Sequence, residues 1–364
     1  MQRIASFVFL GVFPALAVVA LFASAIESDS VATDFRQFHA AAEAILRSAS
    51  PYEAGEAVAP WGGPFPYPPL PALLAVPLTL LSAHSAGLLV MASLVVVAMA
   101  IPYVLGVRDW RCYGLLLLWP PVISAIQTGN ITLWFGLACA IVWRLRDRVY
   151  PVAIAIGLTL AAKFFLWPLV VWLAATRRAL SAALACAFGA GVLLASWGVL
   201  GFSGFLDYPD LLRRLEEAVG ADSYTVYIVG LDLGLPSEVA RAGWAALGLG
   251  LIAYVVVLAR RGDERGAFIV SIAAALALTP IVWLHYFALL AVVVALAQPR
   301  LGLVWFVPLG MVVTPGSGQP TPFETSWTLT VAALTIALAL RASLLVGSVR
   351  SDRNALAHPG ASTA

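Results

Sequence analysis

Long apolar runs, interrupted by short polar breaks, are the feature that most restricts how this chain can fold. Ala, Leu and Val dominate these runs, and the mean hydropathy of the 364-residue chain is +0.93. Such a value lies far above that of soluble domains and predicts an integral membrane protein. Lipid offers no hydrogen bonds, so only helices and closed barrels satisfy the backbone there. The unbroken runs favour helices over the alternating strands of a barrel.

The arginines predict how the chain crosses the membrane. Lys163 is the single lysine, and the arginines cluster near residues 108–111, 144–148, 177–178, 260–265, 300 and 350–353. Because cytoplasmic loops carry an excess of basic residues, placing every cluster inside gives about 12 transmembrane helices with both termini cytoplasmic. Residues 69–82, which are rich in proline, then form a helix in the outer interface. Residues 4–26 have the length of a span and are interpreted as a retained helix, not a cleaved signal peptide.

The predicted fold is all-α and polytopic, with a single transmembrane domain over residues 1–347. Residues 27–85 and 202–237 form two outer loops, and residues 348–364 form a disordered cytoplasmic tail. The first loop contains an amphipathic helix near residues 34–48 and a Pro/Gly-rich stretch at 61–69, and the second contains a polar helix at Asp210–Val219. The glycines near 316–318 follow no strand, so they are interpreted as a turn and not as a nucleotide-binding motif.

One acidic residue is the first candidate for a functional site. Asp34 follows the first apolar run and lies at the predicted outer mouth of a membrane helix. A carboxylate in this position is energetically costly, which makes it a functional candidate by default. A simpler interpretation is that Asp34 is the N-cap of the helix that follows. The two roles are compatible with each other.

Three polar breaks between short helices supply further candidates on the side of Asp34. The candidate residues in these breaks are Gln127, Asn130, Lys163, Trp283, His285 and Tyr286. A lysine in an outward cavity suits a phosphate group. Each has a structural alternative: Gln127 and Asn130 as helix caps, Lys163 extended to lipid headgroups, His285 as a hydrogen-bonded interior side chain, and the aromatic pair as part of an interface belt.

The cysteines do not indicate a metal centre or a disulfide framework. Cys112, Cys139 and Cys186 fall inside apolar runs, with no CxxC spacing and no neighbouring histidine. A single acid cannot hold a divalent ion alone. No cofactor is therefore predicted, and a divalent metal is compatible with the pattern but not indicated by it.

The order and spacing of several motifs together resemble one known family. The motifs are Asp34-Phe35-x-x-Phe38-x-Ala40-Ala41, Pro51-Tyr52, Phe65-x-Tyr67-Pro68-Pro69-Leu70, Gln127-x-Gly129-Asn130, Gly157-Leu158-x-Leu160-Ala161-Ala162-Lys163 and Thr279-Pro280-x-x-Trp283-x-His285-Tyr286. This pattern resembles glycosyltransferase family 87 of the GT-C superfamily. The chain departs from many relatives at Phe38-His39 and at Asp222-Ser223-Tyr224. These departures bear on the acceptor more than on the reaction.

The resemblance implies a GT-C-like fold and transfer of a sugar at the outer leaflet of the cell membrane. The implied donor is a polyprenyl phosphate carrying mannose, with arabinofuranose as the alternative sugar, and the implied acceptor is a glycolipid or lipid-linked glycan. Members of the family are typically actinobacterial, which fits the arginine-rich composition. The hypothesis for the mechanism is a reaction that inverts the sugar, with Asp34 as general base and with Lys163 and His285 on the donor phosphate. Tyr67, Gln127, Asn130, Trp283 and Tyr286 would contact the substrates.

Two functions of other classes remain open from the sequence. A transporter or flippase for a lipid-linked sugar would share the apolar groove and the polar cluster. Transporters often contain related halves with breaks at matching positions, and the sequence offers no convincing match between its halves. In a non-catalytic membrane scaffold, Asp34 would serve only as a helix cap.

Overall fold

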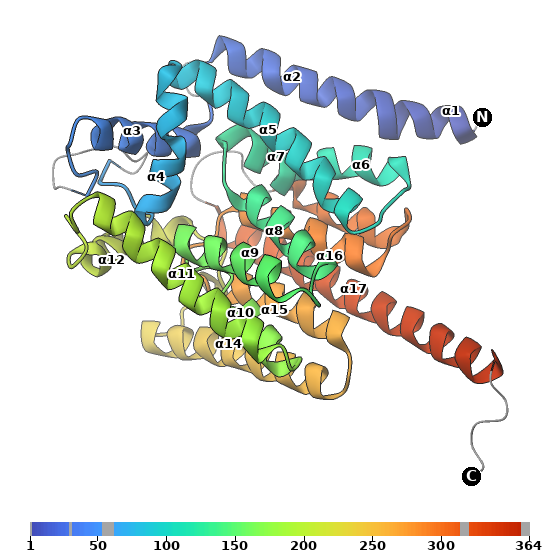
Figure 1. The fold of residues 1–364 in the computed structure, drawn as a ribbon. Coiled ribbons are helices and arrows are strands. Elements are labelled where there is room, and N and C mark those ends of the chain that lie inside the picture. The colour runs from blue at the N-terminus through green and yellow to red at the C-terminus, as the bar shows by residue number, and fades with distance from the viewer. Residues whose placement is uncertain (1, 29–30, 53–61, 314–319, 358–364) are drawn as a thin grey trace.

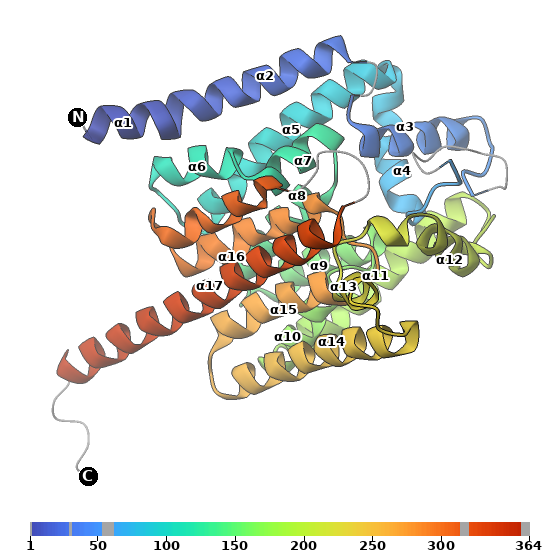
Figure 2. The same cartoon turned by 180° about the vertical axis from the view of Figure 1, so that it is seen from behind.

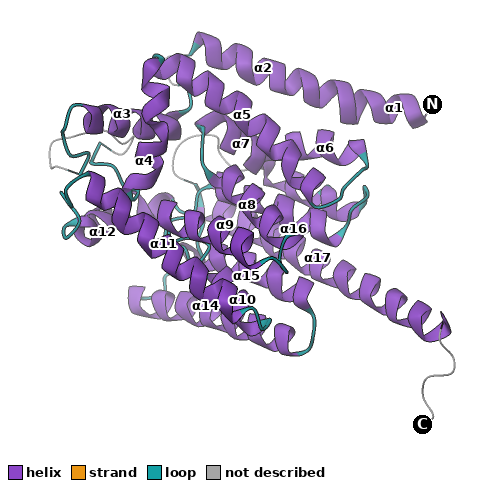
Figure 3. Ribbon diagram, viewed as in Figure 1, coloured by secondary structure: helices purple, strands orange, loops and turns teal. Residues whose placement is uncertain are grey.

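The structure is a computed structural model that describes residues 2–28, 31–52, 62–313 and 320–357. Within these ranges the chain forms helices and loops without strands (Figure 3). The α-helices are α1 (Gln2–Phe7), α2 (Phe13–Glu27), α3 (Thr33–Leu46), α4 (Pro69–Ala75), α5 (Ala83–Val104), α6 (Trp110–Leu117), α7 (Pro120–Thr128), α8 (Thr132–Arg144), α9 (Val149–Ala162), α10 (Pro168–Ala175), α11 (Ala179–Val199), α12 (Tyr208–Val219), α13 (Val226–Asp232), α14 (Ser237–Arg260), α15 (Glu264–Leu278), α16 (Leu290–Ala297) and α17 (Pro322–Ala357). A π-helical segment, η1 (Val8–Val12), joins α1 to α2, and the 3₁₀ segments are η2 (Val76–Leu80), η3 (Gly220–Asp222), η4 (Leu284–Leu289), η5 (Leu303–Trp305) and η6 (Val307–Val313).

Long apolar helices confirm the prediction of a membrane protein. Five helical stretches in the described part of the chain are long and apolar enough to cross a bilayer: Ile4–Glu27, α5, α11, α14 and Pro322–Ser343 within α17. The pair α7 and α8 makes a sixth if it counts as one span bent by 117°. Other apolar segments are shorter helices, such as α9. The number of twelve spans therefore stays a prediction.

The most apolar helices lie at the centre of the bundle. Every residue of α16 is buried, and so is the stretch Gly266–Leu276 of α15. A helix that is apolar on all sides is expected in such a central place. Outside this centre, α9 packs closely on α11 where two glycines meet. A Cβ atom on Gly157 would lie 3.0 Å from the backbone nitrogen of Gly189, so small residues at this crossing permit the approach.

The bundle has two chemically different ends, between which helices such as α11 and α14 run (Figures 1 and 2). The helices α3 and α12 lie at one end, which we call the cavity end. The start of α1 and the end of α17 lie at the other end. Helix α3 confirms the amphipathic helix predicted near residues 34–48, and α12 confirms the polar helix predicted at Asp210–Val219.

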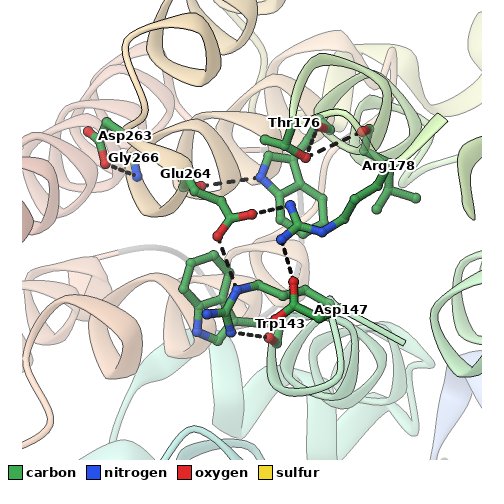
Figure 4. A network of polar contacts seen from close by, with 10 residues as sticks. Trp143, Asp147, Thr176, Arg178, Asp263, Glu264 and Gly266 are labelled. Atoms are coloured by element: carbon green, nitrogen blue, oxygen red, sulfur yellow. Dashed lines mark hydrogen bonds and ion pairs between the residues drawn. The ribbon is translucent and has the colours of Figure 1, made fainter. Parts of the chain in front are cut away.

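The second end, which we call the arginine end, joins three loops that are distant in sequence (Figure 4). Glu264, at the start of α15, accepts hydrogen bonds from Arg146 and from Arg178. Arg178 also donates to Asp147 over 2.7 Å, and the indole of Trp172 donates to the backbone oxygen of Glu264. Three of the arginine clusters predicted to share one side of the membrane therefore meet at one end of the bundle.

The C-terminal part differs from its prediction. The sequence predicts a disordered tail from Ser348, whereas α17 continues as a helix to Ala357. The physical reason is the absence of Pro and Gly between Ser348 and Ala357, so nothing in the backbone stops the helix there. Residues 358–364, residues 53–61 of the first outer loop and the turn predicted at 316–318 lie outside the described residues.

Candidate active site

Asp34 lies on α3 and faces a cavity. The residue is 8% exposed, although a carboxylate is rarely buried without a partner. The helix begins after Ala32, whose φ of 49° is left-handed, and Asp34 falls in the first turn without capping the helix through its side chain. The alternative in which Asp34 is the N-cap is therefore wrong. Its negative charge still lies at the positive end of the helix dipole, which stabilises an ionised carboxylate.

Asn130 holds one oxygen of this carboxylate. Its side-chain nitrogen donates a 2.6 Å hydrogen bond to Oδ2 of Asp34. The bend that brings the two together is made by Gly129, which ends α7 in a left-handed conformation with φ of 70°. A Cβ atom on Gly129 would lie 2.8 Å from the Cβ atoms of Ala32 and Phe35, so only glycine lets this bend approach α3 so closely.

His285 approaches the same oxygen from another part of the chain. Its Nε2 lies 3.7 Å from Oδ2 of Asp34, and the residue is 4% exposed. Among the described residues, Nε2 has no hydrogen-bond partner. The alternative of a hydrogen-bonded interior histidine is therefore not what the structure shows for this atom. A buried nitrogen without a partner is costly and is typical of functional sites.

The segment that presents His285 is fixed by the second outer loop. Helix α15 ends at Leu278, and the chain bends at Pro280 and Ile281 before η4 begins after Trp283. The backbone nitrogen of Tyr224 donates to the oxygen of Val282 over 2.7 Å, and the nitrogen of Val282 donates to the hydroxyl of Ser223 over 2.8 Å. These bonds connect Asp222-Ser223-Tyr224, where the sequence differs from many relatives, directly to the candidate site.

Lys163 supplies a cation to the same cavity. It ends α9 in an extended conformation, and its ammonium group contacts the hydroxyl of Tyr286. The ammonium nitrogen lies 4.5 Å from the ring centroid of Tyr286 and 5.0 Å from that of Tyr67. Aromatic faces attract cations at such distances. Asp34 and Lys163 carry opposite charges and lie close enough to attract each other electrostatically.

An aromatic cluster holds Tyr67 in place beside Lys163. The hydroxyl of Tyr52 donates to the backbone oxygen of Tyr67, and that of Tyr208 donates to the oxygen of Pro66. Tyr52 also stacks on Trp197 of α11, with ring centroids 4.6 Å apart. Burial raises the pKa of the Tyr67 phenol well above its usual value, so this phenol stays neutral at physiological pH.

The cavity has a volume of about 910 Å³ and joins polar and apolar walls. Its polar side includes Asp34, Lys163, Tyr67 and Tyr286, which come from four separate parts of the chain. Its apolar side includes Leu160, Phe164, Leu193, Trp197, Leu278, Ile281 and Trp283. Phe164 is 72% exposed, so the apolar wall continues to the outer surface of the bundle. Such a cavity is large enough for a sugar together with part of a lipid.

Three predicted site residues do not line the cavity: Asn130 and His285 lie beside Asp34, and Gln127 does not join the others. Gln127 is exposed on α7 and does not line the cavity. Although Asn130 follows it by three residues, the left-handed turn at Gly129 sends the two side chains in different directions. In the described part of the chain, no group of three His, Cys, Asp or Glu side chains is arranged to hold a metal ion.

Four residues at this site were missed by sequence reasoning. Gln37 lines the cavity and lies one turn after Asp34, so the helical spacing could have indicated it. Thr132 contacts Asn130, and its position two residues later is typical of a side-chain turn. Arg213 and Glu216 line the cavity from α12. No sequence signal indicates that α12 lies against it.

Comparison with models of protein families shows the family of this chain. The sequence model of glycosyltransferase family 87 matches residues 65–281, which is more than half of the chain. The chain belongs to glycosyltransferase family 87. No curated protein and no solved structure matches it significantly. The protein is therefore a membrane glycosyltransferase, as the motifs predicted.

The family match covers only part of the candidate site. Asn130 and Lys163 lie within it, whereas Asp34 and His285 lie outside. The hydrogen bond between Asn130 and Asp34 and the contact between Lys163 and Tyr286 connect the two sets in space. The geometry therefore extends the candidate active site of this glycosyltransferase beyond the region that the family model matches.

Proposed function

We propose that this glycosyltransferase moves mannose from a polyprenyl-phosphate donor to a glycolipid or lipid-linked glycan, with inversion at the anomeric carbon. The single observation that carries the proposal is one cavity in which a carboxylate and an ammonium group face the same space. A base and a phosphate-binding cation are the two charges that this reaction needs. The apolar wall ending at Phe164 suits a lipid-linked substrate and favours it over a water-soluble sugar nucleotide.

Asp34 is the general base in this proposal. The acceptor hydroxyl gives its proton to Asp34 while its oxygen bonds to the anomeric carbon. The bond from that carbon to the phosphate oxygen breaks on the opposite face, and the electron pair leaves with the polyprenyl phosphate. Displacement from one face inverts the sugar. A positioned base of this kind contributes roughly 10²–10⁴-fold to a rate.

Lys163 and His285 stabilise the leaving phosphate in this proposal. The phosphate gains negative charge as the bond breaks, and fixed cations or donors aimed at that charge are a large catalytic term. Lys163 lines the cavity and meets this need as a cation. His285 does not line the cavity, so its proposed role as a donor requires its Nε2 to become accessible to the phosphate when the substrate binds. Trp283, Tyr286 and Tyr67 offer ring faces for the sugar. Gln127 is exposed, so any substrate contact it makes lies outside the cavity.

The cavity end is proposed to face the outside of the plasma membrane, with both ends of the chain cytoplasmic. The support is the arginine end, which lies at the end of the bundle away from α3 and α12 (Figures 1 and 2) and gathers arginines as cytoplasmic loops do. In a Cys186→Ala background, Asp210→Cys on α12 should react with an impermeant maleimide in intact cells. Arg261→Cys, at the end of α14, should react only after permeabilisation. The opposite pattern would reverse the orientation.

The decisive experiment asks whether a new glycosidic bond forms. Membranes containing the protein are incubated with radiolabelled polyprenyl-phosphate-mannose, and lipids are separated to find label on a new species. Asp34→Asn should lower this transfer by at least about 10²-fold while the protein remains in the membrane. Near-normal transfer by purified Asp34→Asn would remove Asp34 from the mechanism. A polyprenyl-phosphate-arabinofuranose donor is run in parallel, and label movement across the membrane without a new bond would favour a flippase.

A further inference from the structure

We propose that Asn130, locked by Thr132, is a positioning residue that selects which oxygen of Asp34 acts as the base. This inference rests on the proposed function and goes beyond it by replacing the predicted role of Asn130 in substrate binding. Asn130 affects turnover only through its effect on Asp34. Thr132 has no part in the predicted site.

The first step is the orientation of the Asn130 amide. Its Oδ1 accepts two hydrogen bonds from Thr132, one from the backbone nitrogen over 2.9 Å and one from the hydroxyl over 2.6 Å. A backbone N–H can only donate, so the atom facing it must be the amide oxygen. A flipped amide would place its own N–H groups against the backbone N–H of Thr132, so this orientation is excluded. The amide nitrogen must therefore face Asp34.

The second step is the consequence for the carboxylate. The amide nitrogen donates to Oδ2 of Asp34, and the Nε2 of His285 lies nearest the same oxygen. Among the described residues, no hydrogen bond engages Oδ1. Because Asn130 is 1% exposed and Thr132 is 2% exposed, water does not compete for these bonds. These contacts hold Oδ2 and prevent the carboxylate from rotating. Oδ1 is then the oxygen that accepts the proton of the acceptor hydroxyl.

The third step separates positioning from binding. The amide of Asn130 uses its oxygen for Thr132 and one of its two N–H groups for Asp34, and its side chain also interacts with the phenol of Tyr67. Asn130 does not line the cavity, whereas Asp34 does. Loss of Asn130 should therefore change turnover and leave the apparent KM for the donor almost unchanged. A residue that binds the sugar would change KM.

The first test uses Asn130 in two backgrounds. Asn130→Ala should lower kcat by about 10- to 100-fold, the range expected for a hydrogen bond to a charged group. In the Asp34→Asn background, measured over long incubations, Asn130→Ala should have no further effect, because its target carboxylate is gone. An equal loss in both backgrounds, or a loss confined to KM, would overturn the proposal.

The second test uses Thr132 and does not require residual activity from Asp34→Asn. Thr132→Val removes the hydroxyl and should lower kcat several-fold, whereas Thr132→Ser keeps the donor and should restore most of the rate. Thr335→Val is the matched control, since Thr335 is also fully buried but bonds within α17. Equal kcat values for the Val and Ser variants at position 132 would contradict the proposal. Normal transfer by Asp34→Asn would remove Asp34 as the base and this proposal with it, whereas the absence of transfer by the wild-type protein would refute the proposed function.

Discussion

The two ends of the bundle use charged residues in opposite ways. At the arginine end, Glu264 is bonded by Arg146 and Arg178, and Arg178 is also bonded to Asp147, so these charges stabilise the fold (Figure 4). At the cavity end, and within the described part of the chain, one oxygen of Asp34 takes part in no hydrogen bond and the buried Nε2 of His285 has no hydrogen-bond partner. The fully paired charges at the arginine end are expected to stabilise the fold, and the incompletely paired buried groups at the cavity end are expected to take part in the reaction.

The largest expected difference between the two ends comes from replacing one cation at each end with methionine. Lys163→Met should lower turnover by about 10²- to 10³-fold, the range for removing a group aimed at developing charge. Arg178→Met, at the other end, should leave turnover of the folded protein within about twofold and lower its thermal stability. Both are measured by transfer assays normalised to folded protein and by thermal unfolding. Equal losses of turnover in the two variants would remove the distinction between the ends.

The next effect concerns the bend that brings Asn130 to Asp34. Gly129→Ala places a side chain in a left-handed conformation and against Ala32 and Phe35. We expect a loss of about 1–3 kcal/mol in unfolding free energy, since strain of this kind costs that much. Turnover should fall as well, because α3 must move away from Asn130. Gly191 of α11 is the control, since a Cβ atom there meets nothing within 4 Å. A Gly129→Ala variant with normal turnover would show that this contact is not required.

The smallest effect is expected at Gln127. Because its side chain is exposed and does not line the cavity, Gln127→Ala should change kcat/KM by less than about twofold, as most exposed substitutions do. The sequence predicts a substrate contact for this residue, so the assay decides between the two. A tenfold rise in KM would restore Gln127 to the binding site.

The sequence predicted which polar residues gather near Asp34 better than it predicted where their side chains point. Asp34, Lys163 and His285 were visible because a polar group in an apolar chain is costly and therefore informative. Helical periodicity does not show which way a side chain points after a left-handed turn, so Gln127 and Asn130 could not be told apart. The position of Thr132 was equally hidden, because its bonds are made within a bend of the chain and not along a helix face.

The number of spans is the part of the fold that the sequence determined least well. Arginine clusters predict which loops share a side, and Glu264 does join two of them through Arg146 and Arg178. Hydropathy, however, gives the length of an apolar run and not whether its helix crosses the bilayer. The bent pair α7 and α8 illustrates this, because two short helices meet at 117° and place Asn130 between them.

The most direct test of the account compares Asp34→Asn with Glu264→Gln in the same preparation. Both replace a carboxylate with its amide, one at each end of the molecule. Asp34→Asn should unfold at nearly the wild-type temperature and lose at least about 10²-fold in transfer of labelled sugar. Glu264→Gln should unfold at a lower temperature and keep near-normal transfer per folded molecule. Normal transfer by Asp34→Asn, or an equal loss by Glu264→Gln, would contradict this prediction.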